Sequence, residues 1–132
     1  MGHFEGRARL KVREGKLDEF KRQAAEMMRQ TREKDTDTLA YDWFLSNDGT
    51  ECEVREGYAD ADGLIEHAHH VAEAREELFR AFAYDHNMTL YGEPSPALAE
   101  LIERLADVVP FRQFSLLQGL DVDVEARSEV AA

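Results

Sequence analysis

Cysteine is nearly absent from this 132-residue sequence, which contains only Cys52. A single thiol excludes an intrachain disulfide and a zinc site built from four thiolates. No apolar run approaches the roughly 20 residues needed to cross a bilayer. The first ten residues, MGHFEGRARL, lack the apolar segment of a secretory signal. These absences predict a cytoplasmic protein without a membrane partner.

Basic residues are also scarce, with 16 lysines and arginines against 28 acidic residues and a formal net charge of −12. Such a chain repels phosphate backbones, so we expect no nucleic-acid partner. No Walker, Rossmann, HExxH or EF-hand spacing is present, and no cofactor or metal is predicted. The composition, 43% hydrophobic and 33% charged, is typical of a globular protein. We expect one domain over residues 1–120 and a polar C-terminal tail over residues 121–132.

The spacing of apolar residues predicts an alternation of strands and helices. A period of two indicates strands over residues 4–12, 38–46, 51–58, 87–92 and 112–119. Steps of three and four indicate helices over residues 16–33 and 95–109. A further helix begins near residue 60 and either continues to residue 86 or breaks near Val71.

This order predicts an α+β fold. It is a ferredoxin-like split βαβ arrangement, with an antiparallel sheet, helices on one face, and an extra C-terminal helix and strand. In that topology the first strand lies beside the third, so Arg7, Arg9 and Lys11 oppose Glu51 and Glu53 across the ladder. The basic strand therefore needs no nucleic acid to neutralise it.

The second strand carries large aromatic side chains on both of its faces. Tyr41 and Trp43 point one way and Phe44 points the other. A single-layer sheet with large apolar groups on both faces favours a partner, and a two-fold homodimer is the commonest solution. We therefore expect a homodimer.

Four short motifs resemble the antibiotic biosynthesis monooxygenase family, which consists of dimeric α/β barrels and includes quinol monooxygenases. They are a Gly-Lys turn entering a helix with Glu-Phe, an aromatic strand, a Glu-x-Tyr strand end and a Leu-x-x-His helix. They lie at residues 15–20, 41–44, 56–58 and 64–67.

The resemblance extends over residues 4–120 and implies an apolar pocket between the helices and the sheet of each subunit. It also implies oxygenation of a phenolic, quinol or polyketide-like aromatic substrate by O2 without a cofactor. The family's best-described site uses an Asn and a Trp on the third strand and a Tyr on the following helix. Val54, Tyr58 and Leu64 occupy those positions here, so that constellation is not carried over. Two alternatives stay open: a non-catalytic barrel that binds a small apolar ligand or a partner, and haem binding through His67.

The helix that begins near residue 60 carries three of the five histidines, at positions 67, 69 and 70. At about 100° per residue, His67 falls at the border of the apolar stripe, whereas His69 and His70 read as a solvated face. The three side chains diverge, which excludes one metal bound by all three. An imidazole with a pKa of about 6.5 suits proton abstraction, so His67 is the candidate general base.

The remaining candidates lie on the strands. Tyr58 is predicted to donate a hydrogen bond to a phenolate, and Trp43 to form a wall of the pocket. Glu56 shares a strand face with Tyr58, and a carboxyl group in an apolar pocket has a raised pKa. For each of these residues, and for His67, the alternative is a purely structural role in the packing of the fold. The further substrate-binding positions are predicted to be Val54, Leu64 and Tyr91.

Overall fold

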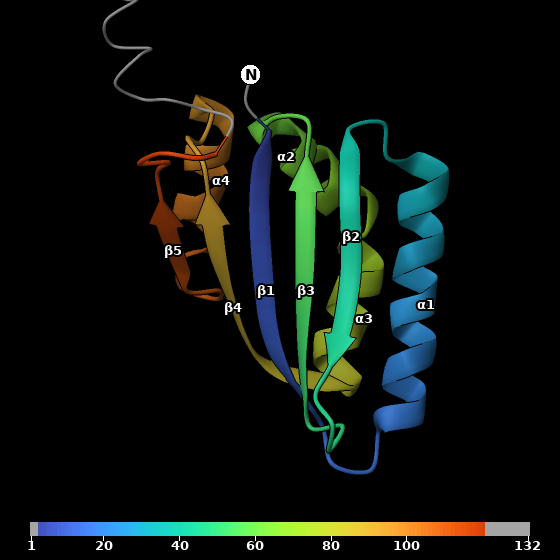
Figure 1. The fold of residues 1–132 in the computed structure, drawn as a ribbon. Coiled ribbons are helices and arrows are strands. Elements are labelled where there is room, and N and C mark those ends of the chain that lie inside the picture. The colour runs from blue at the N-terminus through green and yellow to red at the C-terminus, as the bar shows by residue number, and fades with distance from the viewer. Residues whose placement is uncertain (1–2, 121–132) are drawn as a thin grey trace, which may run out of the picture.

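The computed structural model describes residues 3–120, and its elements follow the predicted order (Figure 1). In chain order they are β1 (Phe4–Val12), α1 (Leu17–Lys34), β2 (Thr38–Leu45), β3 (Glu51–Tyr58), α2 (Ala61–His70), α3 (Ala72–Ala81), β4 (Ala83–Tyr91), α4 (Pro96–Leu105) and β5 (Phe111–Phe114). The predicted tail, residues 121–132, lies outside the described residues.

The strands form one sheet in the order β2-β3-β1-β4-β5. The helices lie behind this sheet in Figure 1, with α1 beside the β2 edge. The α+β, ferredoxin-like arrangement is confirmed, with the first strand beside the third. One detail was wrong, because β5 pairs with β4 in parallel and the sheet is mixed. The connection through α4 returns the chain to the end of the sheet where β4 began, which gives a parallel neighbour.

The stretch after Asp60 resolves into two helices rather than one. Val71 separates α2 from α3, with φ −97° and ψ 8°. The second helix ends at Ala81, although the sequence pattern allowed it to reach residue 86. Ala83 and Tyr84 instead pair with Val12 and Lys11 of β1, so sheet pairing overrides the helical preference of this segment.

The charged face of β1 is neutralised largely as expected. Arg9 Nε lies 3.2 Å from an Oε atom of Glu53, and Arg7 Nε lies 3.7 Å from the other. Lys11 is opposite Glu51 in the ladder, but its ammonium group pairs with Asp85 at 3.4 Å. These are exposed pairs and contribute little stability.

The core lies between the inner face of the sheet and the helices. Phe4, Tyr58, Leu78 and Leu90 are among its fully buried side chains. The other face of the sheet carries the charges and several exposed aromatic side chains. Among the described residues, no helix combines the length and apolarity that crossing a bilayer requires.

Candidate functional site

A cavity of about 720 Å³ lies between the inner face of the sheet and helices α2, α3 and α4. Its lining is mostly apolar and includes Leu10, Met88 and Leu101. Polar side chains also line it from several elements, among them His67 from α2 and Glu56 from β3. A cavity of this size, with few polar groups, is typical of a site for a small apolar molecule.

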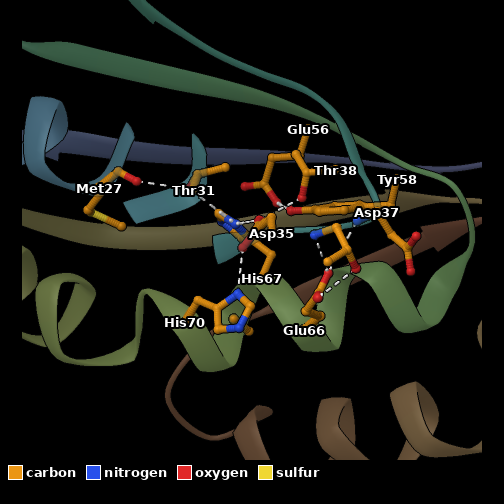
Figure 2. Close-up of polar contacts among 12 residues, drawn as sticks. Met27, Thr31, Asp35, Asp37, Thr38, Glu56, Tyr58, Glu66, His67 and His70 are labelled. Atoms are coloured by element: carbon orange, nitrogen blue, oxygen red, sulfur yellow. Dashed lines mark hydrogen bonds and ion pairs between the residues drawn. The ribbon is translucent and has the colours of Figure 1, made fainter. Parts of the chain in front are cut away.

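His67 on α2 is held by the carboxylate of Asp35, which lies at the C-terminal end of α1. Asp35 ends α1, and its backbone N–H donates to the carbonyl of Thr31 at 3.0 Å. The Oδ2 atom of Asp35 lies 2.8 Å from Nδ1 of His67 (Figure 2), and the residue His67 is only 4% exposed. An ionised carboxylate is only an acceptor, so Nδ1 carries the hydrogen. Nε2 then keeps its lone pair and is the basic atom of the ring.

The second oxygen of Asp35 contacts another histidine. Oδ1 lies 2.7 Å from Nδ1 of His70, and Thr38 Oγ1 donates to Oδ2 at 2.6 Å. The expectation that His70 lies on a solvated face is therefore wrong, whereas His69 is exposed. Burial acts to raise the pKa of Asp35, but the hydrogen bonds from Thr38, His70 and His67 outweigh it and the pKa is lowered.

Glu56 and Tyr58 form a second buried polar pair on β3. The Tyr58 hydroxyl donates to Oε1 of Glu56 (Figure 2), at a distance of 2.5 Å. Tyr58 is 0% exposed and Glu56 is 8% exposed. Burial raises the pKa of Glu56, against the opposing influence of His67, Tyr58 and Arg75. Burial also raises the pKa of Tyr58 well above its usual range, and the adjacent Glu56 adds to this effect. The pair therefore favours its protonated forms.

Aromatic rings fix the orientation of the His67 imidazole. Its centroid lies 4.5 Å from that of Tyr41 and 5.8 Å from that of Tyr58. Trp43 packs edge-on against Tyr41 at 5.8 Å and against Phe20 at 6.0 Å. The catalytic candidate thus has a carboxylate on one ring nitrogen and an aromatic wall around it.

The structure brings most of the predicted site residues to one place. The cavity is lined by His67, Trp43, Glu56, Val54 and Leu64. Tyr58 is not part of the lining and reaches the cavity only through its hydrogen bond to Glu56.

The prediction that Tyr91 lies at the cavity was wrong. Residues alternate along β4, so Leu90 points into the core and is 0% exposed, whereas Tyr91 points to the opposite face. There Tyr91 is 38% exposed and stacks on Phe114, with centroids 5.9 Å apart.

Sequence reasoning missed three residues of the site: Asp35, Arg75 and His86. Arg75 lines the cavity and follows buried Val71 by four positions, a spacing that places it on the inner face of α3. His86 also lines the cavity and stacks on Phe79 at 4.4 Å. Burial and the charge of Arg75 lower the pKa of His86 to about 4. Nothing in the sequence links Asp35 to His67, 32 positions away.

With this geometry in view, the comparisons identify the family. The sequence model described as "Antibiotic biosynthesis monooxygenase" matches residues 7–83, more than half of the chain. The protein belongs to this family, as the four motifs suggested. A comparison with curated protein sequences finds no match.

Solved structures extend the likeness beyond the matched segment. MupZ from Pseudomonas fluorescens is 26% identical with a TM-score of 0.76, covering 92% of this chain and 95% of that one. A putative antibiotic biosynthesis monooxygenase from Nitrosomonas europaea is 18% identical (TM-score 0.62), covering 71% and 92%. Rv0793 from Mycobacterium tuberculosis is 22% identical (TM-score 0.61), covering 73% and 99%. The last two show the fold alone. The coverage by MupZ is wide enough to include the added α4 and β5.

Across residues 3–120, no group of three or more His, Cys, Asp or Glu side chains is arranged to hold a metal ion. Asp35, His67 and His70 instead satisfy one another by hydrogen bonds.

Proposed function

We propose that this protein is a cytoplasmic, cofactor-independent monooxygenase that uses O2 on a phenolic, quinol or polyketide-like aromatic substrate. The observation that carries the proposal is the Asp35–His67 pair at the wall of a large apolar cavity. Membership of the family supports the reaction class. The single thiol, Cys52, is free and buried, which suits a reducing compartment.

His67 acts as the general base in this proposal. With Nδ1 engaged by Asp35, Nε2 accepts the acidic proton of a substrate bound in the cavity. The carboxylate of Asp35 stabilises the imidazolium that results and keeps the ring in one orientation, as in other carboxylate–histidine pairs. Proton abstraction is the step that needs the protein, because the deprotonated aromatic ring is the electron donor.

The electron-rich anion then reduces molecular oxygen. One oxygen atom is added to the substrate, which loses two hydrogens, and the second oxygen atom leaves as water. Atoms and electrons therefore balance without another reductant. The apolar walls, to which Trp43, Val54 and Leu64 contribute, orient the substrate and exclude water.

Glu56 supplies the returning proton in this scheme. Its raised pKa favours the protonated acid, and it lies in the cavity wall beside His67 (Figure 2). The hydroxyl of Tyr58 fixes the Glu56 carboxyl group through the 2.5 Å hydrogen bond. Tyr58 is thus a positioning residue, in place of the direct contact to a phenolate that the sequence suggested.

Oxygen uptake tests the proposal directly. Chelator-treated protein would be assayed against hydroquinones and anthrone-like phenols, with His67→Gln and the matched control His69→Gln on the exposed side of α2. We expect uptake above the spontaneous rate, reduced about 10²–10⁴-fold by His67→Gln and unchanged by His69→Gln. Uptake that survives His67→Gln would remove the proposed base. No uptake with any of these compounds would favour the rival function, a barrel that binds an apolar ligand without turnover.

The proposal includes a homodimer that packs sheet against sheet. Phe44 on β2, Tyr91 on β4 and Phe114 on β5 are 54%, 38% and 44% exposed. Large apolar groups on the uncovered face favour a partner. Sedimentation at micromolar concentration should give twice the mass of 15.1 kDa, and a monomeric mass would contradict this part of the proposal.

A further inference from the structure

Arg75 is a cation in the wall of the mostly apolar cavity. Its guanidinium makes one hydrogen bond, from Nη1 to the carbonyl oxygen of Ala68 at 3.3 Å. No ion pair joins it to an acidic side chain of residues 3–120. A guanidinium has five N–H donors, so this one bond to the protein leaves donors that can contact a ligand in the cavity.

The charge of Arg75 acts on groups from several strands that face the cavity. Burial is the main cause of the pKa shifts at Glu56 on β3 and His86 on β4, and the positive charge of Arg75 contributes at both. It also acts on Tyr41 of β2, whose pKa burial raises. Since Arg75 lies on α3, its charge reaches across the cavity to the sheet.

Some other arginines of this chain differ from Arg75 because an acidic side chain pairs with them. Arg80 lies on the same helix and also lines the cavity, but its guanidinium pairs with Glu77 at 2.5 Å. Arg29 pairs with both Glu26 and Glu33. A ligand that carries a negative charge would stabilise a partly buried cation beside apolar walls. Glu56, the one buried acidic side chain in the lining, favours its neutral form.

We infer that the cavity binds an aromatic carboxylic acid, with its carboxylate on Arg75 and its acidic ring position toward His67. A planar guanidinium fork matches a carboxylate and forms two parallel hydrogen bonds with it. His67 and Arg75 lie on consecutive helices, and both line the cavity. One ligand held between them presents its ring to the base. The orientation of the ring toward His67, and turnover of the acid as a substrate, rest on the proposed function, whereas binding of the acid does not require turnover.

Two matched pairs of probes test this inference by calorimetry at pH 7.5: benzoate with benzamide, and 2-naphthoate with 2-naphthamide. Each pair differs in charge but hardly in shape, and the two sizes probe the fit to the cavity. We expect the wild-type protein to bind the carboxylate of a pair about tenfold more tightly than the amide, because hydrogen bonds to charged groups are the stronger ones. Arg75→Gln should remove this preference.

Arg22→Gln is the control, because it removes an exposed positive charge on α1 that does not line the cavity; it should keep the preference. Arg75→Lys serves if Arg75→Gln fails to fold, and it should retain part of the preference through its charge. Equal affinity for carboxylate and amide, a preference that survives Arg75→Gln, or no binding of any probe at millimolar concentration would overturn the inference. Oxygen uptake is measured separately, so a failed monooxygenase proposal and a failed anion site are told apart.

Discussion

Nδ1 of His67 and Oδ2 of Asp35 lie 2.8 Å apart, although the two residues are 32 positions apart and belong to different helical segments. Asp35 also accepts from Thr38 and contacts His70, and its side chain is 1% exposed. One buried carboxylate therefore joins the end of α1, the start of β2 and the last turn of α2. It both orients the candidate base and stabilises the fold around it.

Asp35→Asn should weaken the fold in a pH-dependent way. The pKa of Asp35 is lowered in the folded state from its ordinary value of 3.8, so its ionised form stabilises the fold above that value. This contribution is lost as the pH falls through the lowered pKa. We expect a loss of about 2–3 kcal/mol in the free energy of unfolding at pH 7, shrinking below about pH 4. Urea unfolding between pH 3 and pH 7 measures it.

Asp37→Asn is the control, because Asp37 is exposed and surface changes usually stay within about 0.5 kcal/mol. A constant difference between wild type and Asp35→Asn down to pH 3 would show that the hydrogen bonds do not depend on ionisation. Asp35→Asn should also lower oxygen uptake by more than its loss of stability explains, because an amide at position 35 no longer selects one tautomer of His67.

Glu56→Gln should give the opposite dependence on pH. Burial raises the pKa of Glu56 from its ordinary value of 4.5. The neutral acid is therefore favoured in the folded state, and stability is lost as the pH rises from about 4.5 through the raised pKa. Glutamine is never ionised, so the variant should match the wild type near pH 4 and become relatively more stable toward pH 9. Parallel thermal melts across this range would show it, and melts that shift equally with pH would contradict it.

Tyr58→Phe examines the partner of Glu56. The change removes the hydroxyl that donates to Glu56 and leaves the buried ring in place. We expect a loss of about 1–3 kcal/mol in the free energy of unfolding, because the carboxyl group loses its partner in a buried place. If Tyr58 only positions Glu56, oxygen uptake by Tyr58→Phe should fall no further than uptake by Glu56→Gln. A deeper loss would restore the direct role suggested by the sequence.

The fold could be predicted because its signals are local. Alternation along residues 4–12 placed Phe4 and Leu10 inward, and a break near Val71 was one of two alternatives for the helix after residue 60. The parallel pairing of β5 and the early start of β4 were missed, because both depend on contacts with distant strands. Local preferences do not report such contacts.

The site was predictable only in part, for a related reason. Helical geometry placed His67 at the border of the apolar stripe, and strand alternation placed Glu56 and Val54 on one face. Asp35 was missed because the geometry of the turn between α1 and β2 brings it to His67. Tyr91 was assigned to the wrong face because the sequence does not determine the register of β4, and the register decides which side chains point into the core.

His86 provides a last test, because its protonation should destabilise the fold. Its pKa is lowered from 6.5 to about 4 by burial and by Arg75, so the folded protein holds the neutral ring. As the pH falls from 6.5 toward 4, His86 becomes protonated in the unfolded chain but stays neutral in the folded protein. The free energy of unfolding therefore decreases by up to about 3 kcal/mol. His86→Gln cannot titrate and should lack this loss. It should also lower stability at pH 8, where the stacking on Phe79 is removed. Urea unfolding of both proteins at pH 4.5, 6 and 8 separates the two effects. A wild-type loss that persists in His86→Gln would assign the acid sensitivity to another group.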